Sequence, residues 1–210
     1  MTKNILKLAA FGAFAFTQGC VSQFLETEPA NPRYLIGPVS AERVSGSSVD
    51  WSLNVDNPKA AHAFDTSKVA VSRSAGRIEY FGDGEWAGRA PRVFQTALIE
   101  SFQDSSRIVA VGDRQTLPLA DYVLQTDIRM IDLDVSNGTP QARLSVYVRL
   151  TNGKSKIYAA RAFSASQPTR SLDGDDVASS FDSVFKDVIA DIVVWTFEQG
   201  EAREATAASS

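Results

Sequence analysis

One cysteine in the chain is placed for chemical modification. Cys20 is the only cysteine among 210 residues, so an intramolecular disulfide is excluded. It follows a start that carries Lys3 and Lys7 and an apolar run over residues 8–16, which is shorter than the roughly 20 residues that span a bilayer. A basic start, a short apolar core and then small or polar residues are typical of a secretory signal peptide. The sequence therefore predicts an export signal over residues 1–19, directly before a thiol.

The end of this signal is similar to the lipobox of bacterial lipoproteins, in which the cysteine is acylated and becomes the mature N-terminus. Gly19 fits the small residue required before Cys20, whereas Thr17 and Gln18 depart from the usual leucine and small residue. The alternatives are a secreted protein with a free cysteine and a cytosolic protein with an apolar N-terminal helix. On the lipoprotein interpretation, acyl chains anchor the protein because each buried methylene contributes roughly 0.8 kcal/mol. In lipoproteins of Gram-negative bacteria, a residue other than aspartate after the cysteine implies sorting to the outer membrane, and here that residue is Val21.

The other residues that could do chemistry form no recognised catalytic or metal-binding pattern. His62 is the only histidine and lies in an alanine-rich loop, which favours a surface or capping role over catalysis. Residues 173–176 (Asp-Gly-Asp-Asp) lack the spacing of an EF-hand loop and favour helix capping over calcium binding. Residues 82–84 (Gly-Asp-Gly) favour a turn over a phosphate loop, and no GxSxG or HExxH pattern occurs. The sequence therefore predicts no catalytic residue, no metal site and no cofactor.

Three aromatic residues within seven positions are the candidate binding residues: Tyr80, Phe81 and Trp86. They precede a predicted helix, so one interpretation places Trp86 beneath that helix as part of the core. The other interpretation is a partly exposed aromatic surface for a partner protein or a lipid, because aromatic residues dominate binding hot spots.

The elements that position these residues follow from hydrophobic periodicity. Alternating or short apolar segments predict strands over residues 33–40, 49–55, 68–72, 77–81, 108–111, 121–135, 142–150 and 156–165. In the strand over 121–135 the apolar positions change from even to odd numbers, which a period of two forbids without a bulge near Met130 and Ile131. The strands over residues 68–72 and 77–81 are expected to form a hairpin around residues 73–76. Asn152-Gly153 predicts a second hairpin turn.

Two amphipathic helices are predicted, over residues 90–103 and 176–198. Asp173 and its acidic neighbours suit the start of the second helix, and Gly200 suits its end. The apolar face of a sheet built from these alternating strands must be buried, and the apolar sides of the two helices can pack against it. We therefore expect an α/β (α+β layered) fold: a mostly antiparallel mixed sheet with both helices packed on one face.

The composition is that of a folded domain, and the predicted signal peptide indicates that this domain is exported. The hydrophobic fraction of 44% and the charged fraction of 22% are ordinary for a folded protein, and the net charge of −4 argues against nucleic acid as a partner. Removing the signal takes away Lys3 and Lys7 and leaves −6. The predicted organisation is a signal peptide (1–19), a lipidated N-terminus and tether (20–31), one domain (32–200) and a flexible tail (201–210).

The order of these segments resembles the ABC-type transport auxiliary lipoprotein family, whose members include PqiC-like proteins. Residues 80–111 carry the resemblance most clearly, with an aromatic strand, a Trp, a Pro-containing stretch, a helix and a further strand. Tyr34-Leu35, residues 121–124, residues 161–165 and the closing helix through Trp195 follow in order. The resemblance covers about residues 32–198 and implies no catalytic residue, because the family is not enzymatic.

The resemblance implies a periplasm-facing lipoprotein tethered to the outer membrane. Its partners would be an MCE-domain periplasmic protein and an inner-membrane ABC permease and ATPase, with a homo-oligomer as a further possibility. The implied role is docking in the transport of phospholipid or another hydrophobic compound. Two alternatives stay open: a periplasmic carrier module that binds lipid in its own pocket, and a hydrolase, which the absent motifs disfavour.

Overall fold

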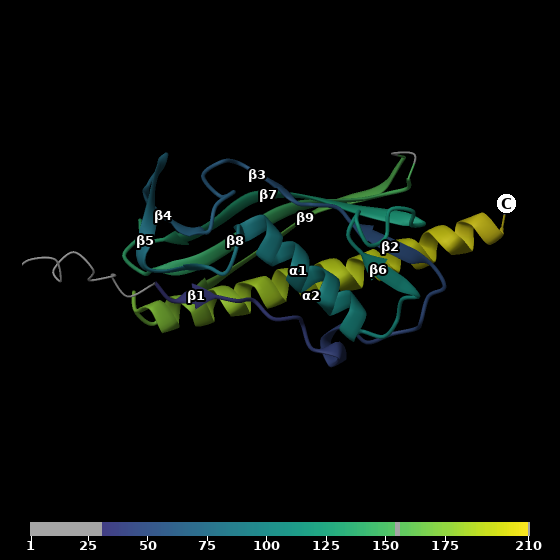
Figure 1. Ribbon diagram of the computed structural model, residues 1–210, viewed down its shortest axis with the longest axis horizontal. Helices are drawn as coiled ribbons and strands as arrows, with labels where there is room; N and C mark the ends of the chain where they lie inside the picture. Colours follow the sequence, from purple (N-terminus) through teal and green to yellow (C-terminus); the bar gives the residue numbers. More distant parts are fainter. Residues whose placement is uncertain (1–30, 154–155, 210) are drawn as a thin grey trace, which may run out of the picture. The chain divides into compact units, whose positions relative to one another are not determined.

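The computed structural model describes residues 31–153 and 156–209. The predictions for the signal peptide over residues 1–19, for Cys20 and for the tether as far as residue 30 lie outside the described residues. Within the described part of the chain, nine strands form one sheet and two α-helices pack against one of its faces (Figure 1). The predicted α/β layered architecture is therefore confirmed.

The sheet is built around one long strand, β7 (Tyr122–Asp134). One side of β7 pairs with the antiparallel β8 (Gln141–Thr151), which pairs in turn with β9 (Ile157–Pro168). The other side pairs in parallel with three short segments in succession along its length. These segments are β2 (Ser52–Val55), β3 (Lys59–Ala60) and β4 (Lys68–Ser74). The long β7–β8–β9 meander makes most of the sheet antiparallel.

Three more strands complete the sheet. β6 (Ala110–Gly112) lies outside β2, and β5 (Arg77–Trp86) lies outside β4 as its antiparallel hairpin partner. β1 (Arg33–Tyr34) pairs in parallel with the end of β5. The hairpin of β4 and β5 was predicted from sequence and is confirmed, although β5 continues further than expected.

The predicted bulge is present in β7. The β7–β8 register shifts between Ile128 and Met130, so Arg129 is the extra residue, one position before the expected site. Before the bulge Leu124 and Ile128 are buried, and after it Ile131 and Leu133 are buried. The bulge thus keeps apolar side chains on the helix-covered face along the whole strand, as the period of two requires.

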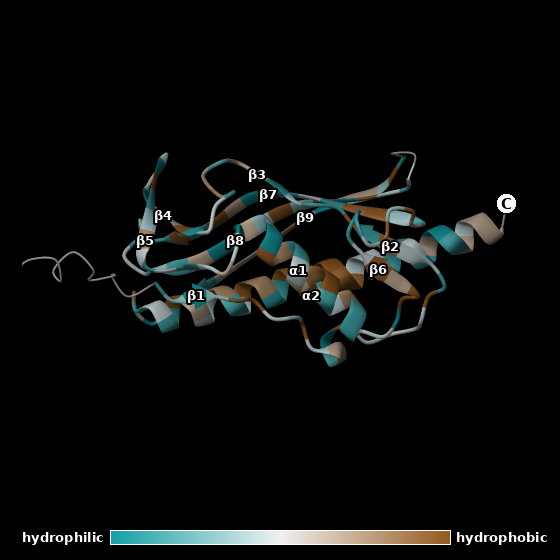
Figure 2. Ribbon diagram, viewed as in Figure 1, coloured by the Kyte–Doolittle hydropathy of each residue, from teal (hydrophilic) through white to brown (hydrophobic). Residues whose placement is uncertain are grey.

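Both helices pack on the apolar face of the sheet. The apolar side of α1 (Ala90–Asp104) is buried, and α2 (Gly174–Ala208) crosses β8 and β9 on the same face of the sheet. The two helices and the sheet enclose a ring cluster in which Trp86 meets Phe181 edge-on with centroids 5.0 Å apart. In Figure 2 apolar residues gather in the middle of α2, whereas its C-terminal end is more hydrophilic. No helix of the described residues has the length and apolar character needed to cross a membrane.

Two local predictions are wrong. Residues 33–40 form a strand only at Arg33–Tyr34, and the chain then runs irregularly into a 3₁₀ turn at Ala41–Val44. Pro38 cannot donate to a sheet, and the Val39 N–H donates instead to Ser101 Oγ of α1 at 2.9 Å. Residues 82–84 lie inside β5 and are not a turn. Gly84 is required there because a Cβ at this position would lie 2.1 Å from the hydroxyl of Tyr34.

The predicted end of the second helix is also wrong. α2 does not stop at Gly200, and residues 201–208 are helical and not a flexible tail. Gly200 lies against Trp51, with room for no side chain, since a Cβ would lie 2.5 Å from the indole. Beyond it Glu204 accepts a hydrogen bond from the Tyr122 hydroxyl at 2.5 Å, and Arg203 lies over the Tyr158 ring. These contacts and alanine-rich composition extend the helix.

Candidate functional site: the open face of the sheet

The helices leave one face of the sheet uncovered, and this open face carries the candidate binding groups (Figure 1). We define it by the side chains of β4, β5, β7 and β8 that point away from α1 and α2. Strand register aligns them in rows, so that Tyr80 is opposite Ala70, Ala70 opposite Asp132, and Asp132 opposite Arg143. The β4–β5 hairpin projects on this side, away from the helices.

The three predicted aromatic residues do not form one surface. Tyr80 is on the open face and is 45% exposed, whereas Phe81 is half-buried and packs against the core. Trp86 is 2% exposed and lies in the core ring cluster, as the first of the two interpretations expected. Successive residues of a strand point to opposite faces, which separates Tyr80 from Phe81. Of the three, Tyr80 is the one that a partner can reach.

A buried ion-pair network lies beside the hairpin, on the same open face. The guanidinium of Arg143 donates to both carboxylate oxygens of Asp132, at 3.0 and 2.8 Å, and to Asp134 at 2.5 Å. The side chains of Asp132 and Asp134 are only 3% and 4% exposed. Ser72 Oγ of β4 also donates to Asp132, and Ser136 donates to Asp134 through its N–H and its hydroxyl. The network joins β4, β7 and β8.

The electrostatics of this network favour the charged forms. Hydrogen bonds from Ser136 hold the pKa of Asp134 below its ordinary value, and the positive charge of Arg143 lowers it further. The hydrogen bond to Asp132 raises the pKa of Arg143. Two buried carboxylates with one shared cation are costly without such hydrogen bonds, so the network depends on all its members.

A hollow of about 430 Å³ lies between the hairpin and β7, and we call it the hairpin hollow. Its floor includes the ion-pair network, and its walls include Phe64, Ile78 and Met130. Ile78 is 38% exposed and presents an aliphatic surface in the hollow. Arg77 and Arg129 also line the hollow, and Arg77 is paired with Glu79 at 2.7 Å.

Two exposed cations on the open face are held over aromatic rings. The guanidinium of Arg129 lies 4.6 Å from the ring centroid of Tyr147, which Arg149 approaches to 5.5 Å. The ammonium of Lys68 lies 5.4 Å from the ring centroid of Tyr80. Cation–π contacts of this kind fix the position of a charge without neutralising it.

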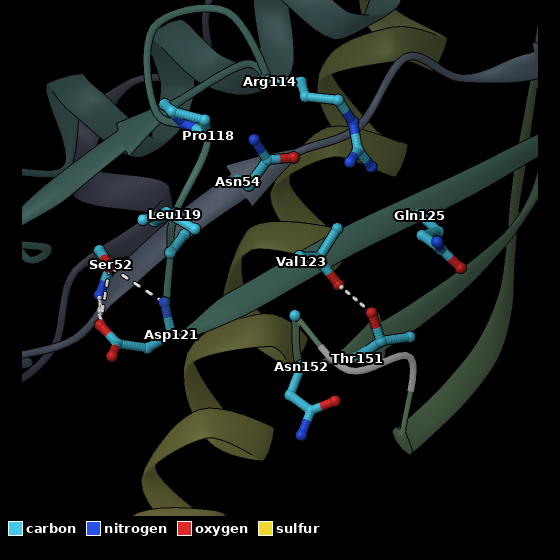
Figure 3. A pocket seen from close by; sticks show the side chains of 12 residues that line it. Ser52, Asn54, Arg114, Pro118, Leu119, Asp121, Val123, Gln125, Thr151 and Asn152 are labelled. Carbon is cyan, nitrogen blue, oxygen red and sulfur yellow. Dashed lines mark hydrogen bonds between the residues drawn. The ribbon is translucent and has the colours of Figure 1, made fainter.

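A second hollow of about 360 Å³ lies near the start of β7 (Figure 3). Asn54 of β2 reaches across to the loop that forms one wall and donates from Nδ2 to the Leu117 carbonyl at 2.8 Å. Asp121 accepts hydrogen bonds from the Ser52 hydroxyl and N–H at 2.7 and 2.8 Å, and these bonds lower the pKa of Asp121. Arg114 at the rim is paired with Asp56. This hollow is lined mostly by polar groups, and most of them have partners, although the buried Asn54 Oδ1 accepts no hydrogen bond from the described residues.

The open face therefore offers ion pairs, hydrogen bonds and apolar contacts to a ligand. No group of three or more His, Cys, Asp or Glu side chains that could hold a metal ion occurs in the described ranges. His62 is exposed in a turn, and the Asp173 side chain caps α2 by accepting from the Asp175 N–H at 3.0 Å, as expected. Cys20 lies outside the described residues.

Sequence reasoning missed the ion-pair network. The sequence does contain a pattern that points to this network, because two acidic residues two positions apart in an apolar strand lie on the same face of the sheet. Asp132 and Asp134 follow the bulge directly, and the next strand places Arg143 opposite Asp132. The sequence pattern alone does not show which residue pairs with these carboxylates, and the strand register is needed to identify Arg143 as their partner.

Comparisons with known proteins agree with this fold. A model of the family described as "ABC-type transport auxiliary lipoprotein component" matches residues 34–193. An uncharacterized protein of Bradyrhizobium diazoefficiens is 25% identical over 152 residues, which cover 72% of this chain and 41% of that relative. The chain thus spans about two fifths of that relative's length.

Among solved structures, a crystal structure of a protein from Xanthomonas campestris is similar with a TM-score of 0.73 and 25% identity, covering 84% of this chain and 98% of that one. The crystal structure of an uncharacterized protein is similar in fold, with a TM-score of 0.60 and 14% identity, covering 78% of this chain and 97% of that one.

Proposed function

Because the chain belongs to the family of ABC-type transport auxiliary lipoprotein components, we propose that it is an outer-membrane-anchored periplasmic lipoprotein that docks onto an ABC transport system. The family is a class of transport components and not a class of enzymes. The observation that carries the proposal is the extent of the match, which includes Tyr34 of β1, strands β2 to β9, all of α1, and α2 as far as Val193.

In this proposal the anchor is the acylated Cys20, and residues 21–31 are the tether that leads to the domain. The partner is an MCE-domain periplasmic protein with its inner-membrane permease and ATPase, and the cargo is a phospholipid or another hydrophobic compound. The open face supports a docking role. It is a broad sheet surface with exposed Ile78 and Tyr80 and with charges fixed by cation–π contacts, and neither helix covers it.

The structure gives less support to a carrier that holds lipid in its own pocket. An acyl chain needs an apolar cavity, whereas the hollow near the start of β7 is built from Asn54, Arg114 and Asp121 among others. The apolar interior between sheet and helices is occupied by packed side chains, such as Trp86 against Phe181. We therefore favour docking over carriage.

The proposal is tested by replacing the acylated residue in the full chain. We expect Cys20→Ser to lose incorporation of radiolabelled palmitate and to move from the membrane fraction to the soluble periplasmic fraction. Affinity purification of the wild-type protein, tagged at its C-terminus in its own host, should recover an MCE-domain protein and an ABC permease.

Ser22→Ala is the matched control, because it changes a hydroxyl two residues away and leaves the cysteine in place. It should behave as the wild type in labelling and fractionation. Membrane association of Cys20→Ser equal to that of the control would refute the anchor, and purification without any ABC component would refute the docking role.

A further inference from the structure

The charges exposed around the hairpin hollow differ in sign from those of the chain as a whole. The chain is acidic, with a net charge of −4. The carboxylates that line the hollow, Asp132 and Asp134, are buried and bound by Arg143, so they present little negative charge to a ligand. The accessible charges near the hollow are therefore dominated by cations.

Arg129 is the most informative of these cations. It is the extra residue of the β7 bulge and is exposed. Within the described ranges no carboxylate lies within ion-pair distance of its guanidinium, which instead lies over Tyr147. Bulges often re-aim a side chain beside a functional site, and this one presents an unneutralised guanidinium at the rim of the hollow.

Lys68 repeats this arrangement on the neighbouring hairpin. Its ammonium lies over Tyr80, and again no carboxylate of the described chain is within ion-pair distance. Both cations are therefore held in position before any ligand arrives, which reduces the entropy lost when a ligand binds. Ile78 and Met130 supply apolar contact surface in the hollow near them.

We propose that the hairpin hollow binds an acidic segment of a protein partner, with carboxylates paired to Arg129 and Lys68 and an apolar side chain inserted between Ile78 and Met130. The proposal rests on the docking function above and names the chemistry of the segment that docks. Complementary charge gives such a contact its specificity and association rate, and the apolar side chain adds buried area.

A protein segment fits this surface better than a bilayer. Recognition of anionic lipid surfaces relies on clusters of four to eight basic residues, whereas this region offers two cations without carboxylate partners among the described residues. The exposed carboxylates beside the hollow are paired, Glu79 with Arg73 and Arg77 and Asp127 with Arg149. They therefore leave Arg129 and Lys68 as the cations that an acidic segment can pair with.

The experiment uses the methionine inside the hollow as a reporter. The chain has two methionines, Met1 and Met130, so ¹³C-methyl methionine labelling of the full chain in non-ionic detergent gives a resonance specific to the hollow. The probe is the tripeptide Glu-Leu-Glu, acetylated and amidated, and its neutral counterpart is Gln-Leu-Gln. We expect the acidic peptide to shift the Met130 methyl resonance with saturation, and to bind about threefold to tenfold more tightly than the neutral one.

Arg129→Gln should reduce that preference because only Lys68 then remains to pair, whereas Arg170→Gln, which removes an 87% exposed guanidinium outside the hollow, should leave it intact. Added salt should weaken only the acidic peptide. Equal affinities for the two peptides, no shift of Met130, or an unchanged preference in Arg129→Gln would overturn the proposal. So would an Arg129-dependent response to phosphatidylglycerol vesicles without one to the peptide. Because no transport partner is used, these failures are separate from failure of the docking function.

Discussion

Replacing Arg143 by methionine tests whether the buried network stabilises the sheet as its geometry indicates. Methionine keeps much of the length of the side chain and removes the guanidinium. Three hydrogen bonds are lost, two to Asp132 and one to Asp134. The two carboxylates keep their bonds to Ser72 and Ser136 but lose the cation that balances them.

The cost should be large because those carboxylates cannot reach water. Breaking a buried ion pair by removing one partner costs about 3–5 kcal/mol, and the 27% exposure of Arg143 places this pair at the lower end, about 3 kcal/mol. Domains are stabilised by about 5–15 kcal/mol in total. We therefore expect Arg143→Met to lower the midpoint of urea unfolding strongly while the protein still folds.

The destabilisation by Arg143→Met should also depend on pH, in a direction that the pKa of Asp134 determines. In the wild type the folded-state pKa of Asp134 is lowered, so its contribution is present above its ordinary value of about 3.9 and is lost as the pH falls through the folded value. In Arg143→Met, burial and the neighbouring carboxylate of Asp132 act against the charge of Asp134, and protonation of Asp134 relieves this. The difference between wild type and variant should therefore shrink as the pH falls from 7 to 4.

Arg149→Met is the matched control, since Arg149 makes the corresponding pair with Asp127 at 2.7 Å, where the carboxylate is 35% exposed. It should cost about 0–1 kcal/mol. Equal costs for the two variants in urea titrations followed by circular dichroism, or a cost of Arg143→Met that does not change with pH, would refute the reasoning.

Three further predictions concern α2. Gly200→Ala should lower the free energy of unfolding by about 1–3 kcal/mol in urea titrations, because the new methyl group would lie 2.5 Å from Trp51. Tyr122→Phe should remove the hydrogen bond to Glu204 and speed hydrogen exchange over residues 201–208, with little change elsewhere. Asp173→Ala should cost about 1 kcal/mol by removing the N-cap, and a change in thermal midpoint below experimental error would contradict that role.

The layers of this fold were predictable because they depend on periodicity within each segment. The position of the bulge was predicted to within one residue. In β7 the apolar residues change from even to odd positions around Arg129, and a strand can keep one face buried through such a change only if it contains a bulge. The start of α2 followed from Asp173, whose side chain can satisfy a helix N–H locally.

Features that depend on distant parts of the chain were not predictable. Residues 35–40 looked like a strand, but their burial comes from packing and from Ser101 of α1, not from a sheet partner. The end of α2 was missed because Trp51 and Tyr122, far earlier in the sequence, hold its last turns. The hairpin hollow exists only because the β4–β5 hairpin projects over β7, and no local pattern specifies that.

The short strand β1 determines how the domain responds to a pull at its N-terminal end. Force applied at residue 31 reaches β1 first, which is held by backbone bonds from Glu85 N–H to the Pro32 carbonyl and from Ala87 N–H to the Tyr34 carbonyl. The next attachments are Ile36, which is 6% exposed in the core, and Val39, which is buried and bonded to α1. Peeling residues 31–38 would release about 28 Å of chain at roughly 3.5 Å per residue, and it would expose the buried side chains of Tyr34 and Ile36. This N-terminal segment therefore lengthens under load only after these core contacts break.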